Sequence, residues 1–174
     1  AIRIKGSEEY GLPTHLDYDI VILMQSWLVQ QANIYRQQLK DYHTRAKRGE
    51  HVEPPALPPH SLVVHKKQIL AFARQAKGGK QYERIEEMLA RLKETNIYIE
   101  QKGKKRRRKG SFSLIADWRT VSKTDTGEVL SVRIDIPNWI YEGVVENPTP
   151  TVLTYNRDYF LLKKPNARLV YRLA

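Results

Sequence analysis

The chain has 174 residues, 41% of them hydrophobic, which is enough for one domain with a real core and excludes a wholly disordered protein. It contains no cysteine, which excludes disulfides and thiolate zinc sites. Lys and Arg number 30 against 19 for Asp and Glu, a net charge of +11. That excess indicates a polyanionic partner, with nucleic acid ahead of an anionic membrane surface, although a protein can also be basic without such a partner.

The first half of the chain predicts a strand, a long helix and a connector. Residues 1–5 alternate in polarity as a short strand does. From 17 to about 48, apolar residues recur every three or four positions, which predicts one amphipathic helix that ends at Gly49. Its longest apolar run, 20–24, is too short to span a bilayer and has acidic flanks, so we expect a soluble, cytoplasmic protein. Proline pairs between 50 and 60 predict an extended loop.

Two short helices are predicted next, at 66–76 and 80–94, after a short apolar stretch at 62–64. The break between them is Lys77-Gly78-Gly79. Two short helices joined by a glycine turn form a helix-turn-helix, although ordinary helical hairpins share this pattern.

Strands follow the helix pair at 96–102, 111–120 and 130–136, with a turn at 124–127. A helix-turn-helix followed by antiparallel hairpins is the layout of a winged helix, so the predicted fold class is α+β. A short helix near 137–145, a strand at 151–154, a helical turn at 157–162 and an apolar-striped helix at 167–174 complete the chain. We expect residues 1–165 to form the winged-helix domain and 166–174 to begin a helix toward a second domain.

The strongest single feature is the run 102–110, in which seven of nine residues are cationic and the other two are glycine. It lies where two predicted strands must reverse, so it predicts a basic hairpin tip that contacts DNA phosphates. Two other interpretations are a solvated turn that blocks sheet aggregation and a patch of the nuclear-import kind.

The predicted second helix, 80–94, has four basic and four acidic residues and no formal charge. Gln81 and Arg84 are of the types that read adenine and guanine edges, and the helix start at Gly79 can bind a phosphate. Alternatively, its acids form internal pairs such as Glu87 with Arg91, and the helix serves a protein interface. The candidate DNA-binding residues are Gly79, Lys80, Gln81, Tyr82, Arg84, Arg91, Lys102, Lys104, Lys105, Arg106, Arg107, Arg108 and Lys109.

Catalytic and metal-binding patterns are hard to find in this sequence. The five histidines show neither HxH nor HExxH spacing, and no P-loop occurs. Asp17 and Asp19 lie at a predicted helix start, where carboxylates are more often caps than metal ligands. We therefore expect no metal, no cofactor and no enzymatic activity.

Several stretches that follow one another over nearly the whole chain form a recognisable pattern: residues 10–20, 78–84, 89–92, 112–118, 135–141 and 153–160. Together, and in this order, they resemble the replication initiator protein A family of plasmids. The resemblance implies an origin-binding protein that recognises double-stranded DNA repeats, and a first winged-helix domain that contributes backbone contacts and homodimerisation. Host replication proteins are further candidate partners.

Two hypotheses of different classes remain at this stage. The first is a noncatalytic origin-binding domain whose basic tip and helix start face DNA. The second is a protein-interaction module in which the winged helix serves dimerisation and the basic loop is incidental. A DNA-nicking nuclease is a distant third.

Overall fold

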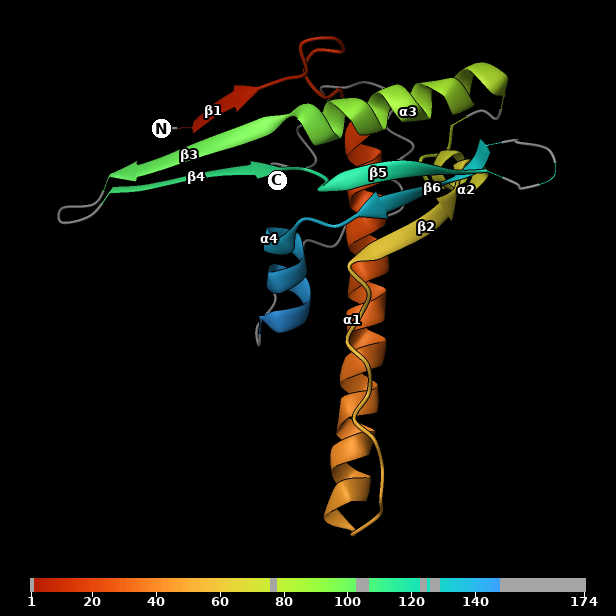
Figure 1. The fold of residues 1–174 in the computed structure, drawn as a ribbon, viewed down its shortest axis with the longest axis vertical. Coiled ribbons are helices and arrows are strands. Elements are labelled where there is room, and N and C mark those ends of the chain that lie inside the picture. Colours follow the sequence, from red (N-terminus) through yellow and green to blue (C-terminus); the bar gives the residue numbers. More distant parts are fainter. Residues whose placement is uncertain (1, 76–77, 103–106, 123–124, 126–128, 148–174) are drawn as a thin grey trace.

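The computed structural model describes residues 2–75, 78–102, 107–122, 125 and 129–147 (Figure 1). These residues form helices and antiparallel strands, and the predicted α+β class is confirmed. The elements predicted at 151–154, 157–162 and 167–174 lie outside the described residues, as do the hairpin tip at 103–106 and all of the predicted turn except Asp125.

Three helices form one side of the core: α1 (Asp17–Lys47), α2 (Lys66–Phe72) and α3 (Gly79–Glu94). In the first half of α1, Ile20, Met24 and Leu28 are fully buried, because this part of the helix lies among the other elements. The second half projects from the body, and Ile34 is largely exposed there (Figure 1). The predicted long helix is confirmed, but only its first half contributes to the core.

The sheet β2-β6-β5 closes the core and consists of β2 (Ser61–His65), β6 (Val129–Asp135) and β5 (Asp117–Ser122). Every pairing in it is antiparallel. Leu62, Val64, Val132 and Ile134 point inward and are buried, whereas Val63 and Arg133 between them are exposed. Apart from two strands between α3 and β5 that belong to a second sheet, the chain order is α1-β2-α2-α3-β5-β6, which with β2 beside β6 is winged-helix-like.

A second antiparallel sheet, β1-β3-β4, extends from the body on the side away from α2 (Figure 1). It consists of β1 (Ile2–Lys5), β3 (Asn96–Lys102) and β4 (Arg107–Ser113). The prediction of one strand over 111–120 is wrong, because β4 ends at Ser113 and β5 begins at Asp117 in the other sheet. Leu114 and Ile115 are consecutive and both buried, which breaks the alternation and carries the chain from one sheet to the other.

The short helix predicted near 137–145 is α4 (Asn138–Tyr141), which continues as one π-helical turn, η1 (Glu142–Glu146). Tyr141 is buried, donates a hydrogen bond to the Pro58 carbonyl (2.6 Å) and stacks on His60 with ring centroids 3.6 Å apart. These contacts fix the extended connector 50–60 to the body. Within the described part of the chain, no helix has the length and apolar character needed to cross a membrane.

Candidate nucleic-acid interface

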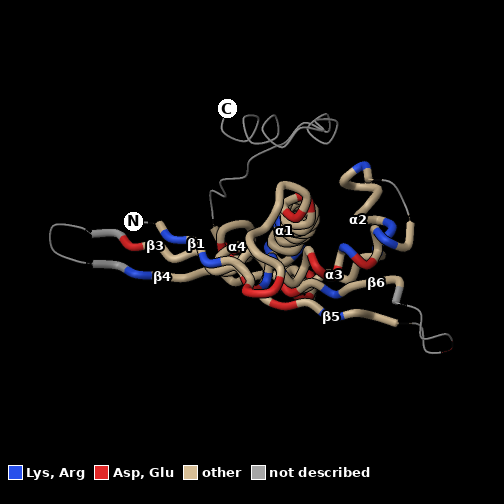
Figure 2. Tube along the Cα trace, turned by 90° about the horizontal axis from the view of Figure 1, so that it is seen from above, with Lys and Arg blue, Asp and Glu red and all other residues tan. Residues whose placement is uncertain are grey.

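The strands β3 and β4 lead directly into the basic run. Their register pairs Glu100 with Lys109, Gln101 with Arg108 and Lys102 with Arg107. Strands of seven residues are about 23 Å long, so this hairpin carries the run well away from the core. Lys109 is exposed, and Figure 2 shows this hairpin extending beyond the helices. Of the predicted DNA-binding residues in this run, Lys104, Lys105 and Arg106 lie outside the described residues. For Lys102, Arg107 and Arg108 the structure gives the position in the strand and nothing of the side chain.

The start of α3 holds the second predicted group. Gly79, Lys80 and Arg84 are exposed there. Gln81 is half-buried and turns back toward the α2–α3 turn, since a Cβ placed on Gly78 would lie 2.8 Å from its Oε1. The side chain of Gln81 therefore lies against the turn, and Lys80 and Arg84 are the residues best placed to meet an anion.

The two predicted groups lie at opposite ends of the molecule. The helix α3 and the strand β3 are consecutive, with only Thr95 between them, and they extend in opposite directions from that joint (Figure 1). At about 1.5 Å per helical residue and about 3.3 Å per strand residue, Lys80 and Lys102 are separated by up to about 45 Å. One helical turn of B-DNA is about 34–36 Å long, so the two groups cannot share one phosphate cluster.

Two of the predicted DNA-binding residues make contacts with the body of the protein. Tyr82 is half-buried and packs against the hydrophobic core. The Arg91 guanidinium donates two hydrogen bonds to Asp17, from Nε to Oδ2 (2.7 Å) and from Nη2 to Oδ1 (3.0 Å). The Arg91 side chain is 15% exposed and the Asp17 side chain 0% exposed. The hydrogen bond to Asp17 is the main cause of the raised pKa of Arg91. Arg91 thus joins α3 to α1, and its contact with DNA stays a prediction.

Other charges on α3 also have intramolecular partners. The buried Lys66 ammonium contacts Glu86 (2.5 Å), and Lys93 contacts Asp117 (2.6 Å). The hydrogen bond from Lys93 lowers the pKa of Asp117. The ion pair of Glu86 is made with α2 and the hydrogen bonds of Arg91 go to Asp17 of α1, so neither is a pair within α3 of the kind predicted for Glu87 and Arg91.

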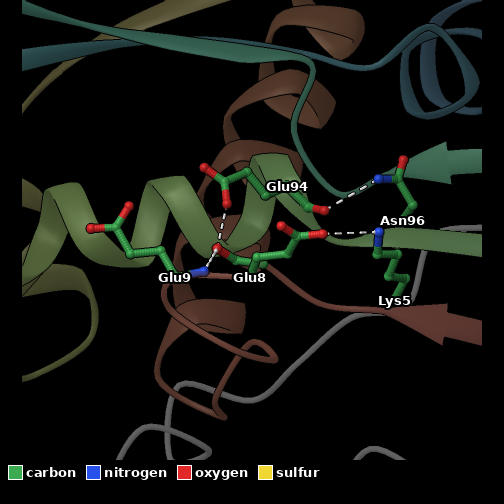
Figure 3. Close-up of polar contacts among 6 residues, drawn as sticks. Lys5, Glu8, Glu9, Glu94 and Asn96 are labelled. Atoms are coloured by element: carbon green, nitrogen blue, oxygen red, sulfur yellow. Dashed lines mark hydrogen bonds and ion pairs between the residues drawn. The ribbon is translucent and has the colours of Figure 1, made fainter.

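The segment after β1 adds acidic residues beside α3. Ser7 donates a hydrogen bond to Glu94, and Glu8 and Glu9 follow it next to the last turns of the helix (Figure 3). The pKa of Tyr10 is raised, first by its hydrogen bond with Glu9 and more weakly by the charges of Glu87 and Glu94. These acidic residues beside the later turns of α3 repel phosphates, so most of the helix is unsuited to lie deep in a DNA groove.

Residues of the projecting sheet that sequence reasoning missed are Arg3, Lys5 and Tyr98. The Arg3 guanidinium lies over the Tyr98 ring, 4.8 Å from its centroid. The alternation of polar and apolar residues in 1–5 and 96–102 predicts the two strands. It does not predict that β1 pairs with β3, because these strands are 90 residues apart in the chain. Among the described residues, no group of three or more His, Asp or Glu could hold a metal ion.

Comparisons with known proteins found a matching family model, a related sequence and a solved structure of similar fold. A family model described as "RPA: Replication initiator protein A" matches residues 1–174. A "Putative replication protein" of Wigglesworthia glossinidia brevipalpis is 30% identical over 106 residues, which is 58% of this chain and 36% of that protein. A crystal structure of domains 2 and 3 of RctB superposes on 99% of this chain with a TM-score of 0.52 and 16% identity, and supports the fold. The chain spans 56% of that structure's chain.

Proposed function

Because the chain belongs to the replication initiator protein A family, we propose that it binds double-stranded DNA at the repeats of a plasmid replication origin. The observation that carries this proposal is the projecting β3–β4 hairpin, whose strand ends and connecting residues include the seven cations of 102–110. A hairpin of this length can reach phosphates while the body stays outside the groove. The role is binding rather than catalysis, and it places the protein in the cytoplasm with host replication proteins as partners.

The basic residues form two separate DNA contacts, one at the hairpin and one at the start of α3. The hairpin binds backbone phosphates, and each contact releases a condensed counterion. Lys80 and Arg84 at the start of α3 provide a second contact more than one helical turn away, with Gly79 offering a backbone N–H. The acidic residues beside the later turns of α3 oppose insertion of the whole helix. Base reading in this chain then rests mainly on Arg84, and other parts of the initiator supply the remaining specificity.

The test is a fluorescence-anisotropy titration of a duplex from the repeats near the protein's own gene and of a scrambled duplex, at several salt concentrations. Replacing Lys105, Arg106 and Arg107 by Ala removes three charges from the hairpin. If all three contact phosphates, affinity falls and the log–log salt slope flattens by roughly three units, at about −0.9 per contact. A matched control removes three exposed charges at the far end of α1, with Lys40, Lys47 and Arg48 changed to Ala.

Equal loss of affinity in the hairpin variant and its control would mean that net charge alone attracts DNA, and would contradict the proposal. Unchanged binding in the hairpin variant would do the same. Metal-dependent nicking of a supercoiled plasmid by the wild-type protein would contradict the noncatalytic role.

Self-association is a second candidate function, favoured by the apolar face of the same sheet. The register places Ile2 and Ile4 on one face with Ile97, Ile99 and Phe112. Ile2 and Ile4 are 71% and 53% exposed, and β1 is an edge strand of the described sheet. Pairing of β1 with β1 of a second copy about a two-fold axis would satisfy the edge and bring the exposed Ile2 and Ile4 of the two copies beside one another. The proposed partner at the β1 edge is therefore a second copy of this chain.

Sedimentation at several concentrations tests this second candidate. Changing Ile2 and Ile4 to Lys should convert a dimer to a monomer, because it places charges in the contact. Val63→Lys is the control, since Val63 is equally exposed but belongs to the other sheet. A wild-type protein that stays monomeric at all concentrations, or a dimer unaffected by the double variant, would contradict the candidate.

A further inference from the structure

The helix α2 ends in a backbone conformation that an arginine does not favour. Of the described residues other than glycine, only Arg74 has a positive φ, of 51°. The N–H of Gln75 donates to the Leu70 carbonyl (2.8 Å), and the N–H of Arg74 donates to the Ala71 carbonyl (3.2 Å). These are the two hydrogen bonds of a Schellman motif, in which the residue with positive φ is usually glycine. A side chain there is disfavoured, because its Cβ comes too close to the following carbonyl oxygen.

The end of α1 shows the same motif with the favoured residue. Gly49 has a φ of 79° there. Its N–H donates to the Ala46 carbonyl (3.0 Å), and the N–H of Glu50 donates to the Arg45 carbonyl (3.2 Å). A Cβ placed on Gly49 would meet no atom of the described residues within 4 Å, so glycine serves the backbone angle rather than a close contact. The chain thus has glycine in one of these motifs and accepts a strained arginine in the other.

The Arg74 side chain is exposed, and no ion pair joins it to any of the described residues. By contrast, Lys66 on α2 and Arg91 and Lys93 on α3 each have an acidic partner. Residues held in a disfavoured conformation cluster at sites that bind ligands, where the surrounding structure maintains the strain. The strain and the exposed charge together indicate that Arg74 meets an anion from outside the chain.

The end of α2 lies beside the start of α3. Gln75 borders one depression together with Gln81 and Arg84, so the residue after Arg74 lies close to the first turns of α3. The sequence from 73 to 82 contains three basic residues and no acidic one. A guanidinium can bind a phosphate through two parallel hydrogen bonds, which gives geometric specificity as well as attraction. The anion that fits this place is therefore a phosphate of the duplex proposed to lie at the start of α3.

We infer that Arg74 binds a backbone phosphate of duplex DNA, and that the strained end of α2 is maintained because it presents this side chain. The inference rests on the proposed duplex contact at the start of α3, and it adds a residue from the other side of the α2–α3 turn. Stability and DNA affinity then depend on Arg74 in opposite directions.

Two variants separate the charge of Arg74 from its backbone strain. Arg74→Gly should raise the melting temperature by about 2–4 °C, because glycine removes the strain. It should also weaken binding of the origin-repeat duplex by about threefold to fivefold, as for loss of one exposed ion pair. The log–log salt slope should flatten by about 0.9, the value for one phosphate contact. Arg74→Ala should weaken binding equally without raising the melting temperature, since alanine keeps the strain.

The end of α1 supplies the matched controls. Arg48→Gly removes an exposed arginine next to Gly49, so it makes the same change of charge far from the proposed contacts and should leave duplex binding unchanged. Gly49→Arg makes the reverse exchange in the same motif and should lower the melting temperature by about 2–4 °C. Fluorescence anisotropy at several salt concentrations measures binding, and thermal unfolding measures stability.

Wild-type affinity and salt slope in Arg74→Gly would overturn the inference. An equal loss of affinity in Arg48→Gly would do so too, because net charge alone would then explain binding. A melting temperature that does not rise in Arg74→Gly would remove the strain from the argument and overturn it as well. If replacement of Lys105, Arg106 and Arg107 weakens binding but Arg74→Gly does not, this inference fails while the proposed function stands. A wild-type protein that binds no duplex at low salt would overturn both.

Discussion

The two three-stranded sheets are built from similar alternating sequences but have opposite relations to the core. In β2-β6-β5, Val132 and Ile134 are fully buried beneath the helices. In β1-β3-β4, Ile2 and Ile4 alternate with basic residues in the same way, yet they are mostly exposed. Both sheets have three antiparallel strands, so the difference lies in what covers them among the described residues, not in their own geometry.

The comparison teaches that alternation identifies residues that share a face but does not tell whether that face is covered. The covered sheet contributes stability through buried apolar area. The projecting sheet contributes little to the core and presents two chemically distinct faces and a basic end. The proposed functions therefore concentrate in the projecting sheet, and the stability of the domain should depend on the covered one.

Truncation of one isoleucine in each sheet tests this division most directly. Ile134→Ala in β6 removes a side chain with 0% exposure and should lower the free energy of unfolding by about 4 kcal/mol. Ile4→Ala in β1 should lower it far less, because that side chain is already mostly in water. Urea denaturation followed by circular dichroism measures both. Similar losses in the two variants would mean that the projecting sheet is part of the core.

Removal of Arg91 should have the next largest effect on stability. Arg91→Ala leaves the buried Asp17 carboxylate without its charged partner, and should cost about 3 kcal/mol, near the lower end for a broken buried pair. Arg84→Ala on the same helix is the control, because Arg84 is exposed and should change stability little. Under the proposed function the effects on duplex binding are reversed: Arg84→Ala should weaken duplex binding more than Arg91→Ala does. An Arg91 variant that stays stable and loses DNA affinity would support the prediction that Arg91 contacts DNA.

The sequence predicted most of the described elements because their patterns are local. The single long helix predicted over 17–48 follows from spacing alone and is observed. The helix predicted over 66–76 is also present but ends earlier, at Phe72. The strand over 111–120 was mistaken because polarity alternates on either side of residues 114–116. Only the burial of Leu114 and Ile115 side by side reveals that the chain changes sheets there.

The candidate site was harder to predict, because it depends on contacts between distant residues. Basic residues on α3 are equivalent in the sequence, yet Arg91 pairs with Asp17, 74 positions earlier in the chain, whereas Lys80 is exposed. The Arg3–Tyr98 pair depends on β1 joining β3 across a comparable separation. Partner choice at such distances is set by the assembled fold, so charge counts along one helix could not distinguish a surface cation from a buried one.

A substitution at Thr95, between α3 and β3, should have a smaller effect on stability and one of opposite sign. Thr95 connects α3 to β3 and is buried, and its hydroxyl has no hydrogen-bond partner among the described residues. Thr95→Val keeps the branched shape and removes a polar group from an apolar site, so it should raise the free energy of unfolding by about 1 kcal/mol. Thr120→Val, at an exposed position of β5, is the control. A clear loss of stability in Thr95→Val would show that the hydroxyl is satisfied.

The smallest effect should come from the exposed pair that joins α3 to the covered sheet. The hydrogen bond from Lys93 lowers the pKa of Asp117 below its ordinary value of 3.8. A carboxyl with a depressed folded-state pKa stabilises the fold above its unfolded pKa, and that contribution is lost as pH falls through the folded pKa. Asp117→Asn should therefore lower the melting temperature slightly at pH 7, and the difference from the wild type should disappear once the pH falls below the depressed pKa of Asp117. Thermal unfolding of both proteins across this range measures it, and a difference that persists at the lowest pH would show that Asp117 acts through packing rather than through its charge.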